Sequence, residues 1–251
     1  MPIENHSDDS GRVPQGVFRT ADLPPGQRNR AWNEIARPFF DYVVPLADAE
    51  MDGEIITQLV GSWLASTIRF NPHSYARGKA RSDDAGLDYY FIQLYRSGTL
   101  QGDCDGRAVC VRHGDILFLD VRESLMLRAT AGEIITLIVP QADLGRPTGQ
   151  LHGHVLEREA PLTQVLARCF ESLESRLPQF TPAQARELQA RTRLALMAAL
   201  DRSVERLSTE HDDALASDPC AESTCLGEWS DDTSMRDVQE TLQEWARAGR
   251  G

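Results

Sequence analysis

The sequence lacks any apolar run of membrane-spanning length and any signal-peptide core. A helix that crosses a bilayer needs about 20 mainly apolar residues, and every apolar run here is much shorter. The opening residues, MPIENHSDDSGR, are polar rather than the apolar core of a secretion signal. These absences exclude a helical membrane protein, and they predict a cytoplasmic protein without a membrane partner.

Cysteine and basic charge are also scarce. Five cysteines occur, none in a CxxC pair, so we expect reduced thiols rather than a disulfide framework or metal site. The net charge is −12, and residues 208–251 hold three arginines against eleven acidic residues, a difference of −8. Domains that bind the phosphates of nucleic acids present a basic surface. We therefore expect no DNA-binding residues and no direct nucleic-acid binding by this chain.

Signatures of catalysis are missing as well. The sequence has no GxSxG elbow to present a nucleophile. Asp115 and Asp120 are typical of turns, and no pair of carboxylates is placed for acid–base work. We therefore name no catalytic residue.

The most informative stretch that is present runs from Tyr89 to Asp120. Tyr89–Tyr95 is rich in aromatic and branched residues, which favour a strand. Asp105-Gly106 suits a type I′ hairpin, since both central residues of that turn need positive φ. Ile116–Leu119 has the composition of a buried strand. Short strands closed by tight turns predict a small sandwich or barrel.

Further strands flank this stretch. They are predicted at Ile55–Val60, Trp63–Phe70, Leu125–Ala129 and Ile134–Val139. About eight strands between Ile55 and Val139 match a small closed barrel or jelly roll. A helix is expected over 28–40, although Pro38 should shorten or kink it.

After Pro140 the apolar period changes from two to about 3.6. Helices are predicted over 162–177 and 181–207, the second starting with a capping box of Thr181 and Gln184. The expected divisions are a disordered N-terminus (1–16), a barrel (17–140), a connection and helical hairpin (141–207), and an acidic linker with a short amphipathic helix (208–251).

One family shares this order of elements. The relevant residues are Phe39-Phe40 after Trp32, Asp88-Tyr89-Tyr90, Gly114 to Asp120, Val139-Pro140, and Leu151 to Leu156. With them the chain resembles the N-terminal ligand-binding and dimerisation domain of bacterial AraC-type (AraC/XylS) transcription regulators, without their C-terminal helix-turn-helix domain. The resemblance implies an α+β fold: a cupin-like antiparallel β-barrel (jelly roll), preceded by one helix and followed by a two-helix antiparallel hairpin. It also implies an unknown small-molecule effector.

A small barrel can hold one small ligand. The candidate ligand-binding residues are Trp63, Thr67, Tyr89, Phe91, Gln93 and Tyr95. Core packing explains the aromatic residues equally well, whereas Gln93 inside an apolar strand needs a ligand, water or backbone partner. A basic excursion holding His73, Arg77, Lys79 and Arg81 would suit either a carboxylate ligand or a solvated loop.

His152-Gly153-His154 resembles the HxH pair of metal-binding cupins. It falls in a connection after Pro140 rather than on a predicted barrel strand, so we interpret it as a polar connection. No metal and no cofactor is expected.

The resemblance implies dimerisation through the helices, as a homodimer or as a mixed dimer with an intact relative. The candidate dimerisation residues are Leu188, Leu194, Met197, Leu200 and Val204. The same apolar residues could instead be used within the monomer. The leading hypothesis is a ligand-sensing regulator domain; a small-molecule-binding cupin enzyme and a nonfunctional truncated regulator fragment are the alternatives.

Overall fold

The structure is a computed structural model, and it describes residues 12–46, 49–78, 88–145 and 151–210. Their strands form two antiparallel sheets. The first has seven strands in the order β1 (Gln15–Arg19), β3 (Gly53–Val60), β4 (Trp63–Phe70), β11 (Gly132–Pro140), β6 (Tyr89–Ser97), β9 (Ile116–Asp120) and β12 (His154–Leu156). The second has five, in the order β2 (Tyr42–Pro45), β5 (His73–Arg77), β10 (Leu125–Ala129), β7 (Leu100–Cys104) and β8 (Arg107–Val111).

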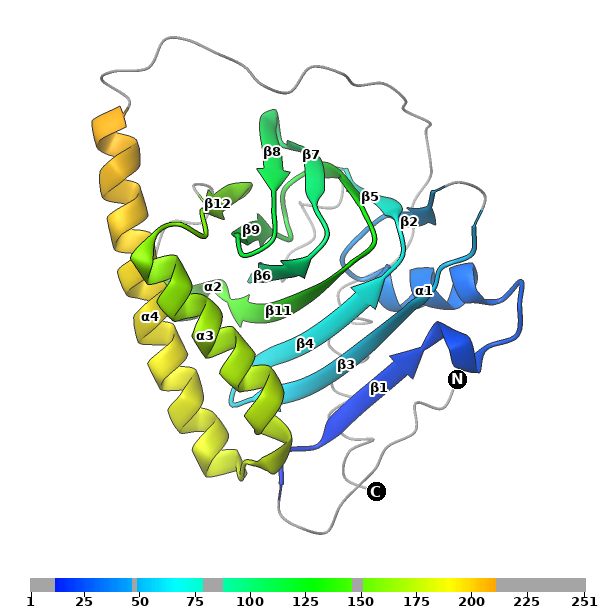
Figure 1. The fold of residues 1–251 in the computed structure, drawn as a ribbon, viewed down its shortest axis with the longest axis horizontal. Coiled ribbons are helices and arrows are strands. Elements are labelled where there is room, and N and C mark those ends of the chain that lie inside the picture. The colour runs from blue at the N-terminus through cyan, green and yellow to red at the C-terminus, as the bar shows by residue number, and fades with distance from the viewer. Residues whose placement is uncertain (1–11, 47–48, 79–87, 146–150, 211–251) are drawn as a thin grey trace.

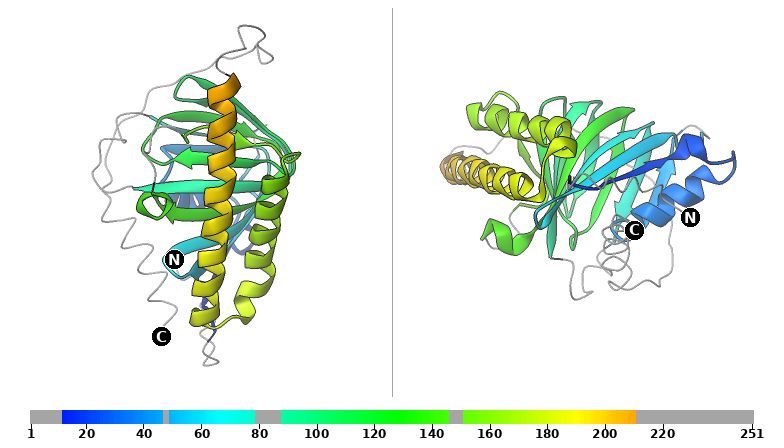
Figure 2. Two further views of the ribbon diagram at one scale, coloured as in Figure 1. Left: turned by 90° about the vertical axis from the view of Figure 1, so that its left-hand side faces the viewer. Right: turned by 90° about the horizontal axis from the view of Figure 1, so that it is seen from below.

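Helices lie on opposite sides of this pair of sheets. Helices α3 (Pro161–Arg176) and α4 (Pro182–Glu210) run side by side along the outer face of the seven-stranded sheet, as Figures 1 and 2 show. Helix α1 (Arg28–Ala36) packs beside β2 on the opposite side. The short α2 (Gln141–Leu144) follows β11 and contacts α4. The fold is therefore the expected cupin-like jelly roll with one helix before it and a helical pair after it.

Both faces of the seven-stranded sheet are buried, and each supports its own core. On β6, the side chains of Tyr90, Ile92 and Leu94 pack in the cluster that includes α3 and α4. Phe91 and Tyr95, at odd positions of the same strand, pack in the cluster between the two sheets. Because successive side chains of a strand point to opposite faces, one set packs in a helix-facing core and the other in a barrel core.

Two tight turns follow directly from their residues. Asp105 and Gly106 have φ of 51° and 86°, so the β7–β8 hairpin has the expected type I′ geometry. Gly61 has a φ of 64° in the turn between β3 and β4. The predicted strand pairs therefore form where turn chemistry allows the chain to reverse.

The helical pair is fixed by a cap and by a buried stripe. The Thr181 N–H donates to the Gln184 side chain at 2.9 Å, and the Gln184 N–H donates to the Thr181 hydroxyl at 3.4 Å, which confirms the capping box. On α3, Leu166, Phe170 and Leu173 are fully buried against the sheet. Burying each such side chain contributes roughly 1.5–3 kcal/mol.

The structure corrects several predicted boundaries. Nine strands, not eight, lie between Gly53 and Pro140 in the described residues, because His73–Arg77 forms β5 within the stretch interpreted as a polar excursion. Strands β2 and β12 were not predicted. Helix α1 ends at Ala36 rather than Phe40, since Pro38 cannot continue it.

The predicted terminal segments are described only in part. Within the expected N-terminal segment 1–16, Val13 is buried and its N–H donates to the Phe180 carbonyl at 3.0 Å, and β1 begins at Gln15. Helix α4 continues to Glu210, beyond the expected start of the linker at 208. Residues 1–11, the rest of the acidic segment and the helix expected at 234–248 lie outside the described residues.

Candidate functional site

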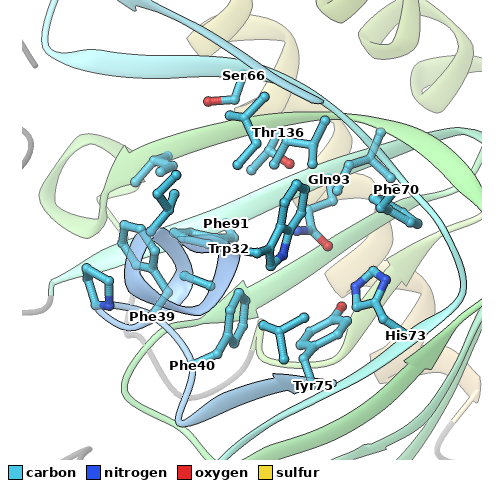
Figure 3. A pocket seen from close by; sticks show the side chains of 18 of the residues that line it. Trp32, Phe39, Phe40, Ser66, Phe70, His73, Tyr75, Phe91, Gln93 and Thr136 are labelled. Carbon is cyan, nitrogen blue, oxygen red and sulfur yellow. The ribbon is translucent and has the colours of Figure 1, made fainter. Parts of the chain in front are cut away.

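An apolar cavity of about 120 Å³ lies between the two sheets. Strands β4, β6 and β11 form one wall, β2 and β5 form another, and α1 with the turn after it lines a third side (Figure 3). The lining includes Trp32, Phe39, Phe40, Ile68, Phe70, Tyr75, Phe91, Tyr95, Ile134 and Ile138. Small-molecule sites have this character, mainly apolar with a few placed polar groups.

The turn after α1 places two phenylalanines in the lining of the cavity. Phe39 meets Phe91 edge-on with ring centroids 4.7 Å apart, and Phe40 meets Tyr75 in the same way at 4.8 Å. The buried Arg77 on β5 donates from Nη1 to the Phe39 carbonyl at 2.8 Å. The proline that ends α1 therefore leads into a turn that the barrel itself holds in place.

A row of polar side chains crosses the apolar wall. Thr136 on the central strand β11 lies opposite Ser66 of β4 and opposite Gln93 of β6. All three side chains are buried and all three line the cavity. Figure 3 shows the Gln93 side chain extending from the sheet into the cavity.

Two members of this row each have one buried atom without a hydrogen-bond partner. The Ser66 hydroxyl is 2.8 Å from the Thr57 hydroxyl and shares a hydrogen bond with it. By contrast, Oε1 of Gln93 and Oγ1 of Thr136 are buried without any partner. Leaving a buried polar atom unsatisfied costs about 1–3 kcal/mol, so these two atoms mark the point in the cavity where a polar guest would be most favourable.

Three other polar side chains of the cavity interact with their neighbours. Tyr75 and Tyr95 interact with each other, and burial is the main cause that raises the pKa of both phenols above its ordinary value. His73 donates from Nδ1 to the Asn71 carbonyl at 2.9 Å and stacks on Tyr75. Burial lowers the pKa of His73 below its ordinary value of 6.5, which keeps the imidazole neutral near pH 7.

The structure divides the six candidate ligand residues. Phe91, Gln93 and Tyr95 line the cavity, and Tyr89 packs against the same core without lining it. Trp63 and Thr67 point to the other face of the sheet: Trp63 packs among the helices, and Thr67 lines a separate surface hollow beside α3. The candidates Phe91, Gln93 and Tyr95 of β6 therefore lie on the cavity face of the sheet and those of β4 on the opposite face, and their role in ligand binding stays a prediction.

The dimerisation candidates also have different environments. Leu200 is fully buried within the monomer, and Leu188 and Met197 pack against the same core. Leu194 is 73% exposed, and Val165 on α3 is 51% exposed. Val204 lies beyond the residues whose side chains are described.

The histidine pair is part of the backbone network rather than a cluster of metal ligands. Nδ1 of His152 accepts from the Asp120 N–H at 3.1 Å, and Nε2 donates to the Ser124 carbonyl at 3.0 Å. His154 begins β12 and lies near Phe118. Within the described residues, no three His, Cys, Asp or Glu side chains gather as metal ligands would.

Comparison with known proteins assigns most of the chain, including most of the cavity wall, to a family. A model described as the AraC-binding-like domain matches residues 36–201. The chain belongs to that family. The AraC-binding-like domain thus spans both sheets after β1 and most of the helical pair, and it contains nearly the whole wall of the cavity.

The comparison with solved structures found further likenesses, of which the match to an AraC-like activator supports the fold. The AraC-like transcriptional activator CuxR matches with a TM-score of 0.67 at 24% identity, covering 74% of this chain and 70% of that one. A RmlC-like cupin from Shewanella frigidimarina matches with a TM-score of 0.27 at 14% identity, covering 39% of this chain and 82% of that one. No curated protein matches the sequence. Among the described helices, none is long and apolar enough to cross a membrane.

Several residues that line the cavity were not among the candidates predicted from the sequence. Trp32, Phe39 and Phe40 come from the segment before the barrel, and Tyr75 and Thr136 come from strands assigned no site residue. The threonine in the apolar run Ile134–Val139 carried the same signal as Gln93, a polar side chain within a buried strand.

Proposed function

We propose that this AraC-binding-like domain is a ligand-sensing regulator of transcription that binds a small-molecule effector inside its barrel. The observation that carries the proposal is the pair of unpartnered polar atoms, Gln93 Oε1 and Thr136 Oγ1, buried in an otherwise apolar cavity. A bound effector would satisfy them. The structural likeness to an AraC-like activator supports this assignment.

The same strands offer a route from the cavity to the helices. Thr136 of β11 faces the cavity, while its neighbours Ile135 and Leu137 face the helix-side core. Arg96 of β6 bridges the carboxylate of Glu133 on β11 at 2.9 Å and that of Glu174 on α3 at 2.7 Å. A ligand that shifts β6 or β11 would therefore act directly on the packing of α3.

We propose that α3 and α4 transmit the response by association in the cytoplasm. The domain would pair through them with a second copy of itself or with an intact AraC-type regulator. Support comes from Leu194 and Val165, large apolar side chains left exposed on the helical pair. Residues 208–251 carry three arginines among eleven acidic residues, so a DNA contact is better assigned to a partner than to this acidic segment.

Light scattering of the purified chain tests the association. We expect a dimer for the wild type and a monomer for Leu194→Glu, because the glutamate would bury a charge in the interface. Val44→Glu, at a 51% exposed position on β2, is the matched control and should remain dimeric. A wild-type monomer at all concentrations would reject association through these helices.

Co-expression tests the regulatory output. The tagged chain should co-purify with an intact AraC-type regulator and lower expression of its reporter gene, and Leu194→Glu should remove both effects. Unchanged reporter output despite stable mixed dimers would contradict the regulatory proposal, and would favour the alternative of a truncated fragment without function.

We infer a binding role rather than a catalytic one. The unpartnered groups in the cavity are an amide and a hydroxyl, which hold a ligand by hydrogen bonds but are weak acids and bases. The alternative, a cupin enzyme, predicts consumption of a ligand that binds. Recovery of a bound ligand unchanged after prolonged incubation would support the binding role; conversion to a product would establish the enzyme.

A further inference from the structure

We propose that the effector of this barrel is a small uncharged molecule, about the size of one ring, whose single polar group donates to Gln93 and accepts from Thr136. This inference rests on the proposed ligand-sensing function and narrows its chemistry to neutral alcohols, phenols and primary amides on an apolar body. Three features of the cavity lead to it.

The first feature is size. The cavity measures about 120 Å³, whereas an engineered apolar cavity of about 150 Å³ binds benzene, and typical drug-sized sites are about 300–1,000 Å³. A nucleotide or an oligosaccharide exceeds this volume. The turn carrying Phe39 and Phe40 limits the cavity on one side, where these rings pack against Phe91 and Tyr75.

The second feature is the pattern of unmet hydrogen bonds. Oε1 of Gln93 is an acceptor that needs an N–H or O–H from a guest. The Thr136 hydroxyl can donate to a guest oxygen, and the two residues lie opposite each other on paired strands. One hydroxyl or one primary amide on the guest satisfies both atoms, because each of these groups donates and accepts.

The third feature is the absence of charge in the described lining. None of the described residues that line the cavity is Asp, Glu, Lys or Arg. Nearby Arg77 does not line it and holds the Phe39 carbonyl from Nη1. His73 is kept neutral by burial, which lowers its pKa. A carboxylate or phosphate entering this space would lose its hydration without gaining a counter-charge.

Three probes of similar size separate the chemical classes. Benzyl alcohol is neutral and polar, toluene lacks the hydroxyl, and benzoate carries a charge. Titrations of the whole chain followed by NMR should show benzyl alcohol binding about tenfold more tightly than toluene, the factor expected for a satisfied buried hydrogen bond. Benzoate should bind more weakly than both.

Matched variants locate the binding. Gln93→Leu should abolish the advantage of benzyl alcohol over toluene, and Thr136→Val should reduce it. Thr67→Val removes a buried hydroxyl from the opposite face of the same sheet, so it should leave all three affinities unchanged. An effect of Thr67→Val as large as that of Thr136→Val would overturn the assignment.

Two further outcomes of the titrations would contradict the proposed ligand chemistry. Benzoate binding more tightly than benzyl alcohol would overturn the neutral-ligand class and leave a ligand-sensing barrel in place. Failure of all three probes to bind would overturn the inference. The proposed regulatory function is judged separately, because association through α3 and α4 and the reporter response are measured without these probes.

Discussion

The indole N–H of Trp63 donates a 2.7 Å hydrogen bond to the carboxylate of Asp143. Trp63 is fully buried on β4, and Asp143 belongs to α2, which directly follows β11. The bond therefore fastens the seven-stranded sheet to the helical side of the domain. Because side chains alternate along a strand, Trp63 lies on the helix-facing side of β4 and Ser66 on the cavity side.

Replacing Trp63 should separate stability from ligand binding. Trp63→Phe loses the hydrogen bond and part of the packing volume, so it should lower the free energy of unfolding by about 1–3 kcal/mol. Its affinity for benzyl alcohol, measured below the unfolding transition, should equal that of the wild type. Trp32→Phe is the paired variant, since Trp32 lines the cavity and should change that affinity. Equal effects of both on affinity would contradict the assigned faces.

The unpartnered hydroxyl of Thr136 should be a stability cost in the ligand-free protein. Thr136→Val keeps the shape and removes the unsatisfied group, so the free energy of unfolding in urea should stay equal or rise by up to about 1–2 kcal/mol. Thr57→Val is the control: that buried hydroxyl bonds Ser66 at 2.8 Å, and its loss should cost about 1 kcal/mol. Equal destabilisation by both variants would show that Thr136 has a partner.

His152 should make the domain lose stability in mild acid. Burial lowers the pKa of His152 below its ordinary value of 6.5. The unfolded chain then binds the proton more readily than the folded one. The contribution of His152 to the free energy of unfolding is therefore complete above about pH 6.5 and declines as the pH falls. His152→Gln, which can keep both backbone hydrogen bonds, should make the decline between pH 6.5 and 5 shallower by up to about 1.4 kcal/mol per pH unit. Urea unfolding at each pH measures it, and identical slopes would contradict it.

Gly53 should tolerate no side chain. A Cβ there would lie 2.6 Å from both the Trp32 ring and the Arg69 carbonyl oxygen. Gly53→Ala should therefore cost about 1–3 kcal/mol by overpacking, and it should shift Trp32 fluorescence and weaken benzyl alcohol binding. Gly78→Ala is the control, since its Cβ would meet only the Asp41 carboxylate, at an ordinary 3.5 Å. Wild-type stability of Gly53→Ala would mean that Trp32 does not pack closely over this strand.

Local patterns predicted the elements of this fold well. The alternation in Trp63–Phe70, the Asp105-Gly106 turn and the Thr181 cap each depend on residues close in sequence, and each forms as expected. The order of elements also pointed to the AraC-type family. The predictions failed where a short segment is a strand only through its neighbours: His73–Arg77 becomes β5 by pairing with β2 and β10.

The sequence by itself determined most of the strands and the three longer helices of this protein, and it marked Gln93 as a polar residue in a buried strand. Only the tertiary structure decided which face of each strand meets the cavity. The physical reason is that both faces of the seven-stranded sheet are covered, one by α3 and α4 and the other by the second sheet. Apolar residues then occupy both faces, and alternation no longer distinguishes them. The opposition of Gln93 and Thr136 across β6 and β11 likewise required the register of the sheet.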